Sequence, residues 1–378
     1  MYIRKRFRVE LRPNIIRHKP LGSAIIGAAV MTAPLLLCGS LATAETRGYV
    51  LSRFSTATNT PDFAVNCPKA GSDRAKFGAD GLKPRVDRAL VDGKPVPPLD
   101  YPDAVQKDPD VETVVGKYAY GFDLGGPAAN KFIDPDTHEK VDNQLWRAVG
   151  CGNSFQSTPP ALPYNEGLGW DAMVDSAPGW AMQITGADLN KDGPVTVTLD
   201  RTIRHLERDA TGGVRSDVSY ALDPSPRSHN VLSGEIKDGV LTIKPADIYL
   251  EGNMPFYSQI DLQNAHMRMR SEAGGKLVGY WGGYTDWHKW VYMYSSRPAN
   301  ADPIGWYRAL EKLADAGPDP VTGKNRLIST TWRLEALPAF LAEDGKIVAT
   351  ATDDGLGGRV QQTVASNGGG PAAAGTAH

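Results

Sequence analysis

Residues 180–208 read WAMQITGADLNKDGPVTVTLDRTIRHLER, and this stretch decides the fold class. Asp192-Gly193 is a hairpin signal, because both central residues of a type I′ turn need positive φ. In residues 194–208, alternation places one set of side chains on a single face, as in a strand with one side against a core. The set is Val195, Val197, Leu199, Ile203 and His205. The stretch therefore predicts antiparallel strands over residues 180–188 and 194–208.

The same pattern continues to Ser295, with Asp238-Gly239 as another hairpin signal and glycine pairs as further turns. Evenly spaced short strands without an intervening helical period are typical of antiparallel all-β folds. We therefore expect a mainly β protein, either a sandwich, a jelly roll or a barrel. Further strands are expected over residues 231–237, 240–244, 258–270, 276–284 and 287–295.

A single helix is expected near the C-terminus, where Asp302-Pro303 is a helix start and Gly317-Pro318 a helix stop. Residues 327–336 are expected to add a last strand. These elements predict one β-rich domain over residues 45–351, with a loop-rich N-terminal third (45–179) and a β block (180–295). Residues 352–378 are rich in glycine and alanine and are expected to form a disordered tail.

The N-terminus has the pattern of a secretory signal peptide, predicted over residues 1–44. Seven basic residues within positions 1–20 precede an apolar run over 21–41, and Ala42-Thr43-Ala44 fits signal peptidase. An uncleaved anchor, or a lipoprotein modified at Cys38, are the alternatives. After cleavage no membrane span is expected, and the protein is predicted to be periplasmic or secreted.

Removal of residues 1–44 changes the charge of the chain. The full sequence carries 41 basic and 43 acidic residues, and the predicted signal peptide takes away seven basic residues and one acid. The remaining 34 bases and 42 acids give a formal charge of −8. An acidic chain without basic clusters has no positively charged surface for the phosphates of nucleic acid, so no nucleic-acid partner is expected.

Two cysteines, Cys67 and Cys151, remain after processing. In an oxidising compartment an even pair predicts a disulfide, worth about 3–4 kcal/mol for so long a loop. Two free buried thiols are the alternative.

Two loops carry oxygen ligands suited to calcium. The first extends over residues 121–151, and the second matches the opening half of a calcium loop at Asp188, Asn190, Asp192 and Gly193. A loop leading into a helix capped by Asp142 is the alternative for the first, and a plain hairpin turn for the second. The candidate ligands in the first loop are Asp123, Asp134, Asp136, Asp142 and Asn143.

The first loop also carries a resemblance. The run Val141-Asp142-Asn143-Gln144-Leu145, followed by Gly150-Cys151, resembles a motif of exported bacterial proteins without an established function. The later run over residues 306–341 is similar to the C-terminal part of those proteins. The resemblance covers most of the mature chain and implies a secreted protein, but it implies no activity and no catalytic residue. Gly125-Gly126 stands where another acid is usual in such proteins.

Aromatic residues are concentrated over residues 280–290, around Gly282-Gly283. Such rings can stack on sugars or apolar ligands, or they can fill a core between sheets. On the ligand-binding interpretation the candidates are Trp281, Tyr284, Trp287 and His288, with Asp286 and Lys289 adding polar contacts. His266 and Arg268 share one strand face with Asn264 and Arg270, which either lines a polar pocket or faces solvent.

Sequence motifs for zinc binding, nucleophilic catalysis and phosphate binding are weak or absent. Four histidines fall in the β block without the spacing of a zinc site: His205, His229, His266 and His288. There is no Gly-x-Ser-x-Gly motif and no phosphate-binding glycine loop followed by Lys-Ser/Thr. We therefore expect an exported ligand-binding or accessory protein for a small molecule or glycan, with calcium as a candidate stabilising ion. The alternatives are a polysaccharide hydrolase, which needs two carboxylates facing one cleft, and a structural component of the cell envelope.

Overall fold

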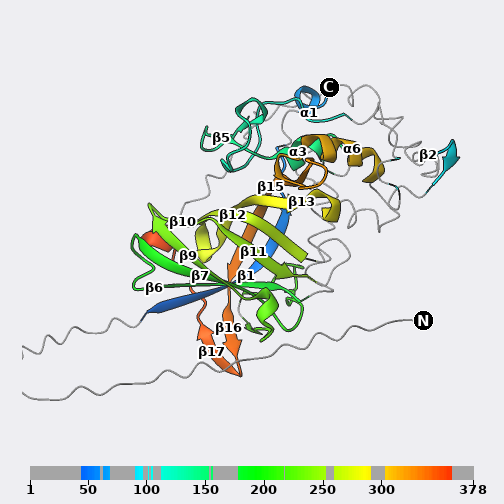
Figure 1. The fold of residues 1–378 in the computed structure, drawn as a ribbon. Coiled ribbons are helices and arrows are strands. Elements are labelled where there is room, and N and C mark those ends of the chain that lie inside the picture. Colours follow the sequence, from blue (N-terminus) through cyan, green and yellow to red (C-terminus); the bar gives the residue numbers. More distant parts are fainter. Residues whose placement is uncertain are drawn as a thin grey trace, which may run out of the picture. The chain divides into compact units, whose positions relative to one another are not determined.

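A computed structural model describes much of the chain after the predicted signal peptide (Figure 1). The predicted signal peptide lies outside the described residues except for Ala44, as do most of residues 59–110. The described ranges are 44–59, 63–68, 90–96, 101, 104, 112–152, 155, 178–216, 218–252, 259–290 and 303–359.

Eight antiparallel strands form a closed barrel (Figure 1). The barrel closes because the first strand pairs with the second on one side and with the last on the other. The expected mainly β, antiparallel fold is therefore confirmed, and of the three architectures the barrel is the one adopted. In spatial order the strands are β1 (Glu45–Thr56), β6 (Trp180–Gly186), β7 (Gly193–Arg201), β9 (Asn230–Lys237), β10 (Val240–Ile243), β12 (Gln259–Ser271), β13 (Leu277–Asp286) and β15 (Asn325–Pro338).

Shorter elements lie around the barrel. Strand β11 (Ala246–Glu251) pairs with β12, and β14 (Ala316–Pro318) pairs with β15. Strands β8 (Ser219–Ala221), β16 (Phe340–Glu343) and β17 (Lys346–Ala349) form a three-stranded sheet. The remaining strands are the pairs β2 (Leu90–Val91) with β3 (Lys94–Pro95) and β4 (Phe132–Ile133) with β5 (Lys140–Val141). The helices are α1 (Phe63–Asn66), α3 (Gln144–Val149) and α6 (Pro303–Leu313), with single 3₁₀ turns η3 (Ala128–Asn130), η5 (Pro226–Ser228), η6 (Ala273–Gly275) and η7 (Leu356–Gly358).

Turn chemistry explains the tight hairpin between β9 and β10. Asp238 and Gly239 have φ of 53° and 77°, as the predicted type I′ turn requires. The connection between β6 and β7 differs from the prediction, because it runs from Ala187 to Asp192 and Gly193 already belongs to β7. The longer loop is used to cover one end of the barrel.

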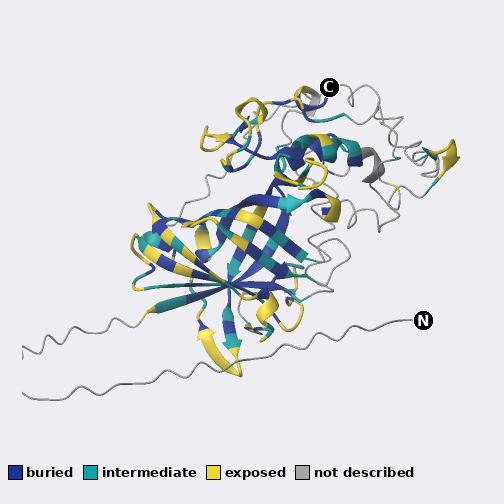
Figure 2. Ribbon diagram, in the orientation of Figure 1, coloured by how far each residue is buried: buried dark blue, intermediate teal, exposed yellow. Residues whose placement is uncertain are grey.

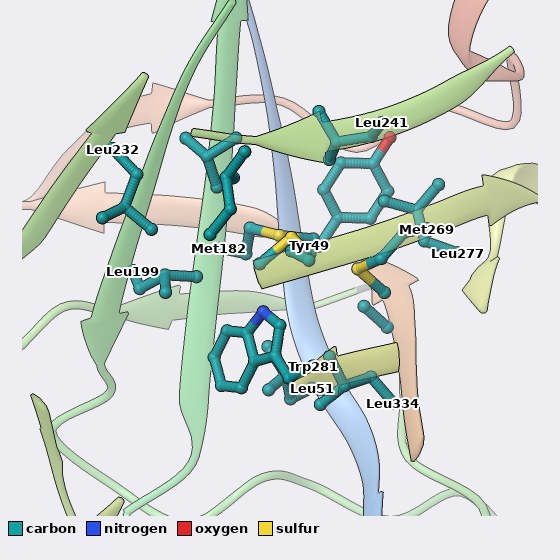
Figure 3. Packing of buried hydrophobic residues seen from close by; sticks show 14 of the residues in the cluster. Tyr49, Leu51, Met182, Leu199, Leu232, Leu241, Met269, Leu277, Trp281 and Leu334 are labelled. Carbon is teal, nitrogen blue, oxygen red and sulfur yellow. The ribbon is translucent and has the colours of Figure 1, made fainter. Parts of the chain in front are cut away.

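The barrel interior is filled by apolar side chains. Phe54 stacks on Trp332 with ring centroids 4.7 Å apart and meets Trp180 edge-on at 5.3 Å. Figure 3 shows Trp281 and Met182 pointing into the same interior, beside Leu51 and Leu334. Each such side chain contributes about 1.5–3 kcal/mol on burial, so the interior is the main hydrophobic core.

A second core lies outside the barrel, against β15. Helix α3 packs there on α6, and the Cys67–Cys151 disulfide joins this core, as predicted. Leu145, Trp146 and Leu310 are its central buried residues. In Figure 2 the buried positions continue from the barrel strands into α3, whereas β17 is exposed for most of its length. This second core holds the segment over residues 112–152 on the outer surface of the barrel.

Several element predictions are wrong in detail. Strand β7 ends at Arg201, so Ile203 lies beyond it and is 53% exposed. Residues 287–290 form a helical turn instead of a strand, and residues 291–295 lie outside the described residues. Strand β1 falls in the expected loop-rich third, where alternation is hard to see because both of its faces are buried.

The predicted disordered tail begins too early. Leu356, in η7, is fully buried among the barrel core residues. Its backbone N–H donates to the Ser271 hydroxyl at 2.8 Å, and the Gly357 N–H donates to the Leu189 carbonyl at 2.9 Å. Residues 352–359 therefore close one end of the barrel, while residues 360–378 lie outside the described part of the chain. None of the described helices is long and apolar enough to cross a membrane.

Replacing Leu356 with alanine tests this closure. We expect Leu356→Ala to lower the free energy of unfolding by about 2–4 kcal/mol, because it leaves a cavity at the end of the core. Urea denaturation measures the loss, and Val321→Ala, at a 90% exposed position, is the matched control. A change within error of the control would show that η7 does not contribute to the core.

Candidate functional site

A cleft of about 350 Å³ opens on the outer surface of the barrel, where β12, β13, β14 and β15 come together. We call it the charged cleft. Its described lining residues are Asp261, Gln263, Asp286, Lys289, Gly317, Pro318, Arg326 and Leu327.

Strand alternation brings the two acids of the cleft together. Trp281 points into the barrel, so Asp286, at opposite parity on β13, points outward. On β12, Ile260 and Leu262 point inward, and Asp261 between them points outward. Both acids lie two residues beyond the paired Gln263 and Tyr284, on neighbouring antiparallel strands. The two carboxylates therefore belong to one face of the sheet.

Glycine allows the opposite wall to approach. Gly317 in β14 has φ of 61°, a conformation that favours glycine. A Cβ at this position would lie 2.7 Å from the Leu327 side chain, so a larger residue would push β14 away from β15.

Each acid of the charged cleft is paired with a base. The Lys289 ammonium lies 2.5 Å from a carboxylate oxygen of Asp261, and an Arg326 Nη2 lies 2.9 Å from Asp286. Asp286 also accepts a hydrogen bond from the His288 backbone N–H at 2.9 Å, and the His288 ring nitrogen Nδ1 lies 3.3 Å away. Burial alone raises the pKa of Asp286, but the His288 hydrogen bonds and the Arg326 charge outweigh it and lower the pKa to about 2.

The bases lie closer to solvent than the acids. The Asp286 and Asp261 side chains are 15% and 34% exposed, whereas those of Lys289 and Arg326 are 47% and 52% exposed. The charged cleft therefore has acids on its strand floor and bases at its mouth.

The aromatic candidates lie mostly elsewhere. Trp281 is fully buried in the barrel core, and Tyr284 is buried with its hydroxyl donating to the Leu124 carbonyl at 2.9 Å. Trp287 belongs to the second core, and its indole donates to the Asn325 carbonyl at 3.2 Å. Its ring stacks on His288 at 3.7 Å. Of these four side chains, that of His288 contacts an acid of the charged cleft, Asp286.

His266 and Arg268 lie further along the outer face of β12, beneath the segment over residues 112–152. Arg268 pairs with Asp134 at 3.1 Å and lies 5.4 Å from the centre of the Phe122 ring. The His266 ring is 5.7 Å from the same ring, and burial lowers the pKa of His266 against the opposing charge of Asp123. This strand face is thus turned outward and partly covered, and neither residue lines the charged cleft.

In the first predicted calcium loop, protein cations neutralise the acids. Lys131 pairs with Asp123 and lies 3.5 Å from the fully buried Asp142. Asp142 in turn accepts hydrogen bonds from the backbone N–H groups of Leu124 and Gly126.

Asp134 is also fully buried, and both of its carboxylate oxygens accept hydrogen bonds. It accepts backbone N–H groups of Gly121, Asp136 and Thr137 as well as the Arg268 guanidinium. Burial raises its pKa, but these hydrogen bonds and the Arg268 charge bring it below the usual value. Among the described residues, no three His, Cys, Asp or Glu side chains form a metal-binding group.

The second predicted calcium loop is held by Arg47, which is 1% exposed. Its guanidinium donates to the Asn190 side chain at 2.8 Å, while Asp188 pairs with Lys191 at 2.7 Å. Asp192 accepts the Asp238 backbone N–H at 3.0 Å. The oxygens of this loop therefore have separate protein partners, and the loop acts as the connection that covers the end of the barrel.

The Val141–Leu145 motif has structural contacts at each position. Val141 and Leu145 are core residues, and Asn143 caps α3 by accepting the Trp146 N–H at 3.1 Å. The predicted cap at Asp142 is thus off by one residue. The Gln144 side chain donates to the Asn130 carbonyl at 2.8 Å. The motif accordingly builds the layer that covers the barrel.

One unusual acid, Asp315, had no signal in the sequence. It lies between α6 and β14 and accepts hydrogen bonds from the Ser329 backbone N–H and hydroxyl, at 2.8 and 2.7 Å. Burial raises its pKa to about 6; the Ser329 hydrogen bonds act in the opposite direction, and the charge of Asp142 adds to the rise. Its position directly before β14 links it to the wall of the charged cleft.

The histidines of the β block are not expected to form a zinc site, and three of the four contact different residues. His229 lies 2.7 Å from Asp200, His266 packs on Phe122 and His288 contacts Asp286, so these three have separate partners.

No protein-family model, curated protein or solved structure matches the chain. The resemblance to exported proteins therefore stays a prediction.

Replacing Asp134 tests whether the first predicted calcium loop is held by a protein cation, Arg268. We expect Asp134→Asn to lower the free energy of unfolding by about 2–4 kcal/mol, because it leaves Arg268 without its partner. Urea denaturation at pH 7 measures the loss, with exposed Asp136→Asn as the control. A calcium-dependent rise in melting temperature that disappears in Asp134→Asn would contradict this interpretation.

Asp315 predicts a particular pH dependence. Its folded pKa is raised above the unfolded value, so the folded state binds the proton more tightly and stability falls as pH rises from about 4 to about 6. Asp315→Asn removes this penalty. Relative to the wild type, the variant should gain on the order of 2–3 kcal/mol between pH 4 and pH 7. Chemical denaturation at both pH values provides the measurement, and an equal difference at both would contradict the prediction.

Proposed function

We propose that this chain is an exported ligand-binding protein whose charged cleft binds a small polar solute. The single observation that carries the proposal is the convergence of four charged side chains from separate elements on one cleft: Asp261, Asp286, Lys289 and Arg326. Small-molecule sites are usually concave, with a few placed polar groups that fix the ligand's orientation. A cleft of about 350 Å³ suits a ligand of the size of an amino acid or a monosaccharide.

Export is supported by two features. The Cys67–Cys151 disulfide fits an oxidising compartment, and the basic, apolar and small-residue pattern over residues 1–44 fits a signal peptide. The acidic charge left after cleavage does not favour nucleic acid.

A polysaccharide hydrolase is the second candidate, because Asp261 and Asp286 share one face of neighbouring strands. A glycosidase needs one of its two carboxyl groups protonated, with a raised pKa, to act as the general acid. The pKa of Asp286 is instead lowered to about 2, and Asp261 is paired with Lys289. No aromatic ring belongs to the described lining of the cleft. These features favour binding over hydrolysis. A purely structural role in the envelope would not require paired charges in a cleft.

Ligand screening by saturation-transfer NMR tests the proposal. The panel contains free amino acids, neutral monosaccharides, uronic acids and small amines, screened against the wild type and Arg326→Gln. We expect at least one class to bind, with at least tenfold weaker affinity in the variant, because the guanidinium is a principal ligand contact at the mouth.

Lys346→Gln, at an exposed position on β17, is the matched control and should bind as the wild type does. Absence of binding, or binding insensitive to Arg326→Gln, would overturn the proposal. Hydrolysis of a polysaccharide that is lost in Asp286→Asn would instead favour the enzyme.

A further inference from the structure

We infer that the ligand of the charged cleft is a zwitterion, with one ammonium and one carboxylate group, as in a free amino acid. This inference rests on the proposed function and specifies its ligand class. It is drawn from the number, the positions and the pairing of the charges that line the cleft.

The charges that line the cleft balance one another. The described lining contains two acids and two bases, so its formal charge is zero. A ligand with a net charge would bring an unbalanced charge into a partly desolvated site, which is unfavourable. A ligand that carries both charges keeps the site neutral.

The acidic and the basic side chains of the cleft differ in their exposure to solvent. The acids Asp261 and Asp286 lie on the strand floor, and the more exposed Lys289 and Arg326 lie at the mouth. Both acids line the same cleft from neighbouring strands, so one ammonium group with its three N–H donors can bond to both. A carboxylate on the same ligand then points toward the mouth of the cleft.

The Arg326 guanidinium is oriented by its contact with Asp286. Arg326 uses Nη2 toward Asp286, which holds the planar group in place from below. A guanidinium held in this way can present a second N–H edge to a carboxylate, with Lys289 as an additional charge. Each charged group of the ligand then lies beside protein groups of opposite sign, and the net charge of the occupied site stays zero.

The rest of the lining suits the body of such a ligand. Leu327 and Pro318 offer apolar contact to a carbon skeleton, and the Gln263 amide can donate or accept a hydrogen bond. No aromatic side chain belongs to the described lining, which gives a sugar ring little to stack on.

Isothermal titration with three related probes tests the inference: L-alanine, N-acetyl-L-alanine and L-alaninamide. The second probe lacks the ammonium and the third lacks the carboxylate, while all three keep the same methyl group. We expect the wild type to bind L-alanine at least tenfold more tightly than either of the others.

Two substitutions should then change the preference in opposite directions. Asp261→Asn removes an ammonium partner and leaves a net positive cleft, so N-acetyl-L-alanine should gain relative to L-alanine. Lys289→Gln removes a carboxylate partner and leaves a net negative cleft, so L-alaninamide should gain. Melting curves confirm that both variants fold, and Lys346→Gln should keep the wild-type order of the three probes.

The outcomes separate the inference from the proposed function. Equal binding of the three probes, or a wild-type preference for either single-charge probe, would overturn the inference and leave a ligand-binding cleft. The same holds if none of the three binds while a neutral sugar binds in an Arg326-dependent way. If neither the probes nor the NMR panel bind, both proposals fall.

Discussion

Closure of the barrel by β1 is the constraint on which the rest of the structure depends. This strand pairs with β6 on one side and with β15 on the other, and the partners Thr56 and Trp332 in β1 and β15 are 276 positions apart (332 − 56). Closure removes open sheet edges from the barrel and directs alternate side chains into one continuous core. It also determines which residues of β12, β13 and β15 face outward. The second core and the charged cleft are both built on that outer surface.

Acids of both predicted calcium loops lie beside the protein's own cations. Asp134 is paired with Arg268, Asp142 lies beside Lys131, and the loop after β6 is held by Arg47. A buried carboxylate is unfavourable unless it is paired or hydrogen-bonded, and each of these acids also accepts backbone N–H groups or belongs to a network. The same acid-rich segments that suggest calcium in the sequence therefore act as attachments between the covering layer and the barrel.

The charged cleft differs from these structural pairs in its exposure. In the covering layer Asp134 and Asp142 are fully buried, whereas in the charged cleft half of each basic side chain is open to solvent. An exposed ion pair contributes little to stability, so stability alone does not account for two such pairs side by side in a concavity. Recognition of a charged ligand gives that arrangement a physical reason, because charges held beforehand lose little conformational entropy when the ligand binds.

Local patterns in the sequence determined strands β6, β7, β9, β10, β12 and β13, the turn at Asp238-Gly239 and the helix that begins at Pro303. These features depend on alternation, on positive φ and on proline at a helix start, which are properties of a few neighbouring residues. The disulfide followed from the count of cysteines and the expected compartment.

Only the tertiary structure decided that the sheet closes, because the pairing of β1 with β15 is not encoded in any local period. It also decided the site, since Asp261, Asp286 and Arg326 come from three strands and meet only once those strands are in register. The aromatic cluster was a poor guide to the site. Trp281 and Trp287 are large and apolar, and such rings are more stable in a core than beside charged groups.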